Sequence, residues 1–205
     1  MNFGFGKKEE PADEVKKYTS LGIGVGSAIK LDLLDWKLLA AELEMQVPDE
    51  DLIVTQVGVM KLSHDGIAYR FYNHVGDFLQ IFDENGIIDE ITMFVRHDSV
   101  FPDDWDFWIG DDPMIGQQEF EIKSGTNYRR LWDTEKEDAV SPWTATEIID
   151  DNITVEHQSM LYGRHVRDDL DDIELLLVGA EDRGETASVE LYLGREIQRN
   201  NITVF

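Results

Sequence analysis

Cysteine is absent from this sequence of 205 residues, which excludes disulfide bonds and thiolate chemistry. Long apolar runs are absent too, so no segment predicts a membrane span. The N-terminal residues lack the apolar stretch of a secretory signal peptide. From these absences we expect a cytoplasmic protein that does not insert into a membrane.

Basic residues are few, with 18 Lys and Arg against 43 Asp and Glu, and the formal net charge is −25. A surface of this sign repels nucleic-acid phosphates, so we expect no binding to DNA or RNA. It attracts cationic partners, among them polyamines, basic protein segments and divalent metal ions. A second interpretation is that the acidity serves only solubility or reflects an acidic host proteome.

Nucleotide-binding loops are missing as well. The stretch "SLGIGVGSAIKLD", residues 20–32, places Gly22, Gly24 and Gly26 at alternate positions. A dinucleotide fingerprint needs G-x-G-x-x-G between a strand and a helix, and a P-loop needs Gly-Lys followed by Ser or Thr. Neither pattern occurs, so we interpret the stretch as a short extended segment with one apolar face and one face that carries almost no side chains.

Patterns for metal-dependent and nucleophilic catalysis are weak. No His-Glu-x-x-His motif, calcium loop or Gly-x-Ser-x-Gly elbow is present. His157 and Ser159 alternate along a predicted strand and therefore share a face, but the sequence identifies neither an acidic partner nor an oxyanion hole for them. We expect no cofactor and no metal site, and we favour a non-enzymatic protein while leaving an enzyme open.

One segment has helical periodicity. "DLLDWKLLAAELEMQ", residues 32–46, predicts a principal amphipathic helix near residues 33–46, with Asp32 as its N-cap. The expected core stripe consists of Leu34, Leu38, Ala41 and Met45, widened by Leu33, Trp36 and Leu43. On this interpretation Leu38 is a core position.

After Pro48 the hydrophobic period changes to two. The segments "DLIVTQVGVMKL", "IAYRFY", "FLQIF" and "IIDEITMFV" predict an antiparallel meander. Further strands are predicted at "QQEFEIK", "NYRRLW", "TATEII", "ITVEHQSMLYGR", "DIELLLVGA", "ASVELYLGR" and "NITVF". The fold class is therefore mainly β (α+β), an antiparallel β-rich sandwich or open barrel with one principal helix near the N-terminus.

The domain organisation follows from the same pattern. Residues 1–19 have no periodicity, and we expect them to be a flexible N-terminal segment. Residues 20–205 are expected to form a single β-rich domain. An alternative is two sub-lobes joined near residues 97–116, the only segment that resembles a boundary.

The segment 97–116 also carries a cluster of aromatic and acidic residues. Trp105 and Trp108 are three residues apart among Asp103, Asp104 and Asp106, so one helical turn would place both indoles on a face. Aromatic faces and nearby carboxylates bind ammonium groups, which makes these residues a candidate cation site. The alternative is that the tryptophans close one end of the core while the aspartates are solvated. We expect at least one tryptophan to belong to the core.

A second cluster is basic. Arg164, His165 and Arg167 stand close together, and Arg129 and Arg130 occur in "YRR". The first three form a candidate patch for an anion or an anionic partner. The alternative is internal ion pairing with the many carboxylates of the chain.

Several motifs, taken together and in order, resemble those of the YjfK-like family of uncharacterised bacterial proteins. They are "LLDWKLLAAEL", "YRFYNHVGDFLQIF", "WDFWIGDDPMIG", "YRRLWD", "MLYGR", and "ELLLVGAED" leading into "VELYLG". The family has no established function, so the resemblance supplies no active site. Genes of the family neighbour those of a phage-shock-protein-A-like protein and a glutathionylspermidine-synthase-like ligase, which implies an envelope-linked or polyamine-linked role and the former protein as a partner.

Two functional hypotheses follow. In the first, the protein is a non-enzymatic binding or adaptor protein that acts through protein contacts in an envelope or stress system, and it has no deep pocket with convergent titratable groups. In the second, it is an accessory enzyme or ligand-binding module for a cationic metabolite such as a polyamine. That hypothesis places a pocket at Trp105 and Trp108.

Overall fold

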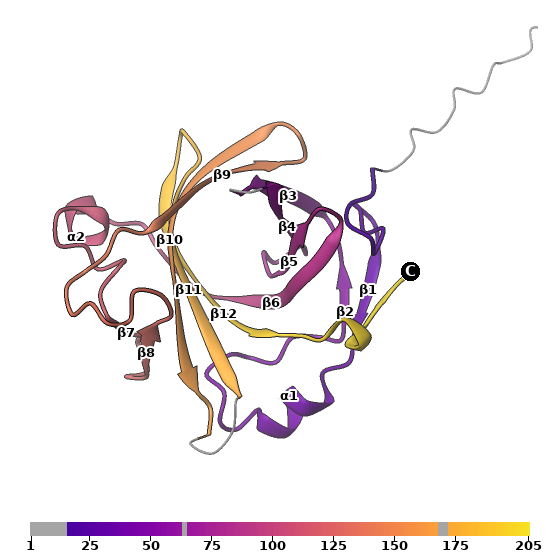
Figure 1. Cartoon of the computed structure of the whole chain (residues 1–205), viewed down its shortest axis with the longest axis horizontal. Helices are drawn as coiled ribbons and strands as arrows, with labels where there is room; N and C mark the ends of the chain where they lie inside the picture. Colours follow the sequence, from indigo (N-terminus) through magenta and orange to yellow (C-terminus); the bar gives the residue numbers. More distant parts are fainter. Residues whose placement is uncertain (1–15, 63–64, 168–171) are drawn as a thin grey trace, which may run out of the picture.

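An eight-stranded antiparallel barrel is the centre of the molecule (Figure 1). The computed structural model describes residues 16–62, 65–167 and 172–205. Two meanders of four strands each form the barrel wall. The first consists of β3 (Gln56–Lys61), β4 (Gly66–Tyr72), β5 (Phe78–Glu84) and β6 (Ile87–Val100). The second consists of β9 (Trp143–Ile149), β10 (Ile153–His165), β11 (Ile173–Asp182) and β12 (Ala187–Glu196).

Two antiparallel seams join the meanders, one between β3 and β9 and the other between β6 and β12. The barrel therefore has two mouths. The first mouth lies at the β5–β6 turn, and the second lies at the β4–β5 and β11–β12 turns. Strands that precede and follow the segment 97–116 thus share one barrel.

The remaining elements lie against the outside of the barrel (Figure 1). A three-stranded antiparallel sheet consists of β1 (Ala28–Leu31), β2 (Asp51–Ile53) and β13 (Ile202–Val204). Close to it are α1 (Leu34–Leu39) and the short helix η2 (Arg199–Asn201). On the side of β10 lie α2 (Trp105–Ile109), β7 (Glu119–Glu121) and β8 (Asn127–Arg130).

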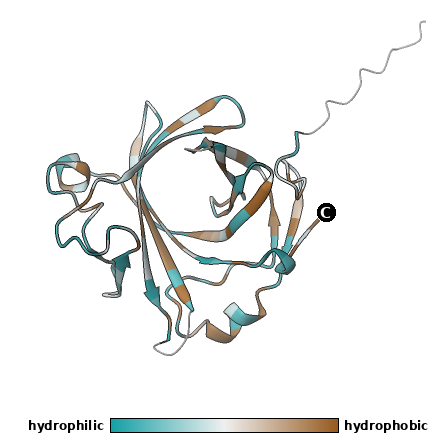
Figure 2. Ribbon diagram, viewed as in Figure 1, coloured by the Kyte–Doolittle hydropathy of each residue, from teal (hydrophilic) through white to brown (hydrophobic). Residues whose placement is uncertain are grey.

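The main hydrophobic core lies between the barrel wall and these outer elements. Outward-facing Phe71, Leu79 and Ile81 belong to the same buried cluster as Leu31 and Trp36 of the outer elements. Apolar and polar residues alternate along the barrel strands, as Figure 2 shows. Because successive side chains of a strand point to opposite faces, one face of each strand contacts the outer elements and the other points into the barrel. The inner face is mixed, since Phe78, Phe94 and Leu177 belong to a second buried hydrophobic cluster there.

The mainly β fold expected from the sequence is confirmed, and so is the first meander, except that "DLIVTQVGVMKL" is divided: residues 51–53 form β2 of the outer sheet and only β3 joins the barrel. The expected principal helix is too long, and its expected core stripe is wrong at Leu34 and Leu38, whereas Leu33, Trp36 and Met45 are buried as expected. It ends at Leu39, and its buried residues are Trp36 and Leu39, while the side chains of Leu34 and Leu38 are 62% and 71% exposed. The bulky indole of Trp36 sets the face that packs on the barrel, and Leu39 lies three residues further along the same face.

The extended segment expected at residues 20–32 is also partly wrong. Gly22 and Gly26 have φ angles of +65° and +85°, a region that favours glycine because it has no Cβ. The chain therefore turns twice before β1 begins at Ala28. Tyr18 packs its ring 5.6 Å from that of Tyr69, and residues 1–15 of the expected N-terminal segment lie outside the described residues.

Neighbouring positions of α1 provide a matched test of this buried face. We expect Leu39→Ala to lower the free energy of unfolding by about 2–5 kcal/mol, because it leaves a cavity in the core. Leu38→Ala should change it by less than about 0.5 kcal/mol, because the side chain is solvated. Urea denaturation followed by circular dichroism measures both values, and a larger loss for Leu38→Ala would contradict the observed orientation.

Among the described residues, no helix is long and apolar enough to cross a membrane.

Candidate binding site in the barrel

The inside of the barrel is rich in buried polar and charged side chains. Cross-strand pairs place Arg70 beside Gln80, and Gln80 beside Thr92, on the inner face. The buried polar residues of the interior are Arg70, Gln80, Thr92, Glu147, His157, Ser159, Glu181 and Glu190. A buried polar group is costly unless it is hydrogen-bonded, so the partners of these groups determine what the interior can do.

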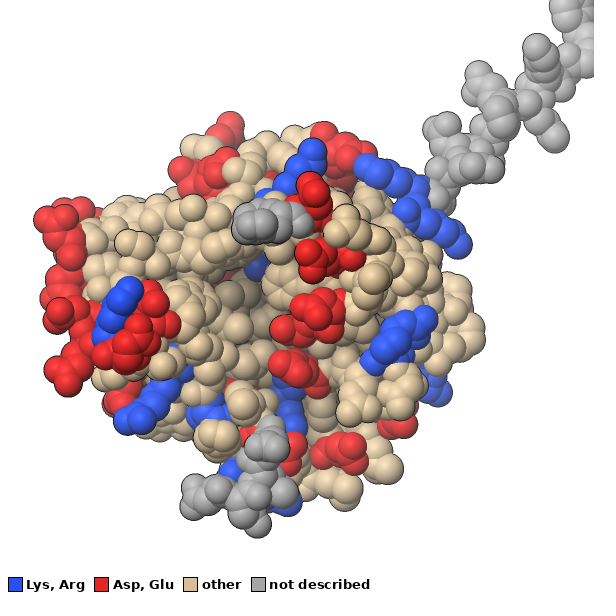
Figure 3. Space-filling model, in the orientation of Figure 1, with Lys and Arg blue, Asp and Glu red and all other residues tan. Residues whose placement is uncertain are grey.

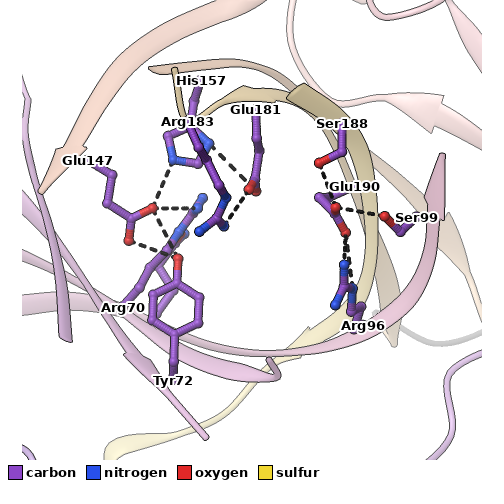
Figure 4. Close-up of polar contacts among 11 residues, drawn as sticks. Arg70, Tyr72, Arg96, Ser99, Glu147, His157, Glu181, Arg183, Ser188 and Glu190 are labelled. Atoms are coloured by element: carbon purple, nitrogen blue, oxygen red, sulfur yellow. Dashed lines mark hydrogen bonds and ion pairs between the residues drawn. The ribbon is translucent and has the colours of Figure 1, made fainter. Parts of the chain in front are cut away.

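Glu147 of β9 is the centre of the first polar cluster (Figure 4). The Tyr72 hydroxyl donates to its carboxylate at 2.8 Å, and Nη1 of Arg70 lies 3.4 Å from Oε2. His157 Nε2 is 2.8 Å from the same Oε2. Since an ionised carboxylate only accepts hydrogen bonds, Nε2 carries a proton. On its other side, Arg70 donates from Nε to Gln80 Oε1 at 2.9 Å.

Two more carboxylates complete the interior. His157 Nδ1 faces Glu181 Oε1 at 3.8 Å, and Arg183 donates from Nη2 to Glu181 at 3.0 Å. Across the barrel, Glu190 accepts from Arg96, Ser99 and Ser188 (Figure 4). Each interior carboxylate is therefore paired with a cationic or hydroxyl donor.

Charge pairing determines the protonation of the first cluster. Burial alone would raise the pKa of the Glu147 carboxyl, but the charge of Arg70 and the hydrogen bonds from His157 and Tyr72 outweigh it and hold this pKa below 4.5. Burial alone would lower the pKa of Arg70, but Tyr72, Glu147 and Glu181 together raise it above its usual value. Both groups therefore stay charged at neutral pH.

A cavity of about 590 Å³ opens above this cluster toward the first mouth, and we call it the mouth cavity. It is lined by Leu62, Arg70, Gln80, Phe82, Glu90, Phe94, Trp132, Ser141, Trp143, Ser159, Leu161 and Leu177. Seven of these twelve side chains are apolar or aromatic, and five are polar. This composition is typical of pockets that bind small organic molecules, and barrel mouths are a common place for them.

The two tryptophans of the mouth cavity come from different elements. Trp143 begins β9 and pairs with Ser159, whereas Trp132 follows β8 in the connection to β9. This connection is held by Arg130, which is 1% exposed and donates to the backbone carbonyls of Gly116, Trp132, Asp133, Lys136 and Asp138. Arg130 thus positions one wall of the mouth cavity from outside the barrel.

Glu90 is the carboxylate that lines the mouth cavity. Its Oε1 accepts a hydrogen bond from Thr92 at 2.8 Å. Burial raises its pKa, the bond from Thr92 opposes that shift, and the charges of Glu196 and Asp89 add to it. Other carboxylates gather at the strand ends of the same mouth, and Figure 3 shows Asp and Glu side chains beside the hollow at the centre of this face. The first mouth is therefore strongly acidic.

The interior does not assemble a catalytic group from His157 and Ser159. They share the inner face, as expected, and an acidic partner is present in Glu147. However, both ring nitrogens of His157 face carboxylates, so neither is directed at the Ser159 hydroxyl. In the described part of the chain, no group of three or more His, Asp or Glu side chains could hold a metal ion.

The candidate cation site of the sequence lies elsewhere, on the outside of the barrel. Trp105 and Trp108 of α2 are partly buried against the main core, whereas Asp103, Asp104 and Asp106 are exposed. Asp104 is the N-cap and accepts a hydrogen bond from the amide of Phe107. These five residues line neither the mouth cavity nor four other main cavities of the described structure.

The candidate basic patch is engaged in ion pairs. Arg164 is 2.6 Å from Glu174, and Arg167 is 2.7 Å from Glu42, while His165 is exposed. This is the arrangement that internal pairing predicts. Glu174, which is fully buried, also accepts from the Tyr128 hydroxyl and from the amide of Met45, so Arg164 belongs to a contact that ties β10 and β11 to the outer elements.

Sequence reasoning missed the mouth cavity. The hypothesis of an adaptor expected no such pocket, and the hypothesis of a ligand module expected it at Trp105 and Trp108 rather than at Trp132 and Trp143. One signal was available in the sequence. Arg70 lies in the middle of "YRFY", between two residues of strong strand preference, where a charge on a buried strand calls for a polar partner.

Comparisons with known proteins add the following. A family model described as "Protein of unknown function (DUF2491)" matches residues 2–203. The uncharacterized protein YjfK of Escherichia coli (strain K12) is 33% identical over 99 residues. That alignment covers 46% of this chain and 44% of the relative, so it spans less than half of the relative's length. No solved structure matches the chain.

Proposed function

This chain belongs to the DUF2491 family of proteins of unknown function, as its YjfK-like motifs indicated, so its function has to be inferred from its own site. We propose that it is a non-enzymatic protein that binds a small amphipathic molecule in the mouth cavity. The observation that carries this proposal is an aromatic-lined cavity above a buried charged cluster. Its volume of about 590 Å³ lies within the usual range for ligand pockets, roughly 300–1,000 Å³.

The proposal of a non-enzymatic protein is supported by how the polar groups are engaged. A general base needs a ring nitrogen or carboxylate directed at the reacting atom. In the interior, His157 lies between Glu147 and Glu181, and Arg70 already has Gln80 and Glu147 as partners. These groups support a rigid floor for a ligand rather than proton transfer.

The polar end of the ligand is cationic in this proposal. Arg70 would be the partner of an anion, but it is 2% exposed and already contacts Gln80 and Glu147. Glu90 has one hydroxyl donor, Thr92, and no basic partner among the described residues, so it has capacity for an ammonium group. The indole faces of Trp132 and Trp143 add attraction for a cation, and the acidic first mouth raises the local concentration of cations.

Octylamine is the simplest probe of this proposal, with octanoate as its anionic counterpart of equal chain length. We expect saturable binding of octylamine by isothermal titration calorimetry, and binding of octanoate at least tenfold weaker. Glu90→Gln should weaken octylamine binding by about tenfold, because it removes the counter-charge at a partly desolvated site. Trp143→Ala should weaken binding of both probes, since it removes an apolar wall.

Glu84→Gln is the matched control, because Glu84 is an exposed carboxylate at the same mouth that does not line the cavity. It should leave the affinity for octylamine unchanged. Equal affinity for octylamine and octanoate, with no effect of Glu90→Gln, would contradict a cationic ligand. No saturable binding of either probe would contradict the mouth cavity as a binding site.

A further inference from the structure

The second mouth of the barrel contains a smaller cleft, of about 100 Å³, which opens on the side opposite to the mouth cavity. It is lined by Gln56, Tyr72, Gly76, Arg96, Ile149, Arg183, Glu190 and Tyr192. A cavity volume of roughly 10–15 Å³ is enough to hold one water molecule, so the cleft is large enough for a small polyatomic ion.

Two ion pairs meet at this cleft, and both have the same orientation. The side chain of Arg96 is 43% exposed, but that of its partner Glu190 is 5% exposed. Arg183 is 42% exposed, and its partner Glu181 is 4% exposed. In each pair the carboxylate is therefore buried and the guanidinium is the more exposed partner at the cleft, although the pairs are neutral and Glu190 also lines the cleft.

Glu190 is saturated by its donors, and among the described residues both guanidinium groups keep N–H donors that their carboxylates do not use. Glu190 accepts from the hydroxyls of Ser99 and Ser188 and from both Nε and Nη2 of Arg96 (Figure 4). Arg183 uses one nitrogen, Nη2, for its bond to Glu181. The Tyr192 hydroxyl, also in the cleft, makes no hydrogen bond to another residue that the structure describes.

Carboxylates at the edge of the second mouth limit what can enter. Asp77 accepts from the amide of Arg96, Asp150 from that of Val57, and Asp182 from that of Gly184. These acids repel large polyanions, whereas a small anion can contact the two guanidinium groups directly. Guanidinium forks match the oxygens of phosphate in geometry.

We propose that the second mouth binds a phosphate-sized anion, either free phosphate or the phosphate group of a small phosphomonoester, between Arg96, Arg183 and the hydroxyl of Tyr192. This site is separate from the mouth cavity, and neither depends on the other being occupied.

Inorganic phosphate and glycerol 3-phosphate are the probes, titrated by calorimetry at constant ionic strength with chloride as the background anion. We expect saturable binding of at least one of them. The tighter of the two distinguishes free phosphate from a phosphomonoester. Arg183→Gln should weaken binding of the tighter probe at least tenfold. Arg129→Gln is the matched control, because Arg129 is 80% exposed and pairs with Glu119 on β7, outside the barrel; its affinity should equal that of the wild type.

Tyr192→Phe provides a second variant in case Arg183→Gln does not fold. Loss of one hydroxyl donor should weaken binding roughly threefold or more while the fold is retained. The proposal is overturned if neither probe shows saturable binding, or if Arg129→Gln weakens binding as much as Arg183→Gln. It is also overturned if a folded Arg183→Gln or Tyr192→Phe protein binds as the wild type does.

Discussion

Glu147→Gln is expected to lower the free energy of unfolding by about 3–5 kcal/mol, the usual loss when one partner of a buried ion pair is removed. Glu147 is fully buried and faces Arg70, His157 and Tyr72. The amide keeps the volume of the side chain but removes its charge, so Arg70 is left with an uncompensated charge in the interior. Urea denaturation at neutral pH measures the loss.

Glu156→Gln is the control for this prediction, because Glu156 is an exposed carboxylate on the neighbouring strand β10. It should change the unfolding free energy by less than about 0.5 kcal/mol. The pKa of Glu147 is lowered in the folded state, so its stabilising contribution is present above pH 4.5 and is lost as the pH falls through the folded pKa. The difference between wild type and Glu147→Gln should therefore shrink in acid; a constant difference would contradict the ion pair.

Gly58→Ala is expected to be about as damaging, with a loss of about 3 kcal/mol or more. A Cβ at Gly58 would lie 1.7 Å from Oε1 and 2.6 Å from Cδ of Glu147. The carboxylate would have to leave its position, and its contacts with Arg70, His157 and Tyr72 would break. In an ordinary strand, alanine would stabilise the protein by roughly 0.5–1 kcal/mol relative to glycine. A loss of stability in Gly58→Ala is therefore expected only because of this steric conflict.

Gly179→Ala is a suitable comparison on the same inner face. Its Cβ would lie 2.7 Å from the hydroxyl oxygen of Ser159, which can rotate away. We expect a loss of less than about 1 kcal/mol, or a small gain. Thermal and urea unfolding of both variants test the prediction. A Gly58→Ala protein as stable as the wild type would show that Glu147 does not occupy the space above Gly58.

The strands were predictable because their signal is local. "IAYRFY", "FLQIF" and "IIDEITMFV" alternate with short turns, and each forms a strand of the meander. The closure of the barrel was not predictable in this way. It depends on the β3–β9 and β6–β12 seams, which join segments far apart in the chain, and no local pattern encodes such pairings.

The candidate site was hidden for a related reason. A strand with one apolar and one polar face is normally interpreted as half-buried, with its polar face in water. Here the face of β4, β5 and β10 that carries Arg70, Gln80 and His157 points into the barrel, where apolar side chains such as Phe78 bury it together with these polar groups. The exposed aspartates beside Trp105 and Trp108 carried the stronger sequence signal, although these residues do not line the mouth cavity.

The buried face of the helix also could not be predicted from the local pattern of apolar residues. The stripe of Leu34, Leu38, Ala41 and Met45 fits a helix of four turns, but α1 has only six residues. In so short a helix, burial is decided by contacts with other elements rather than by the longest apolar stripe. Trp36 packs against the core, and this leaves Leu34 and Leu38 in solvent.

The five tryptophans allow a direct test of the central claim, that the ligand binds inside the first mouth. Each indole N–H gives its own signal in a ¹H–¹⁵N spectrum, and single Trp→Phe variants assign the signals. On titration with octylamine, we expect the signals of Trp132 and Trp143 to shift with one saturable curve, while those of Trp36, Trp105 and Trp108 stay in place. Saturable shifts at Trp105 and Trp108 with none at Trp132 and Trp143 would contradict the account.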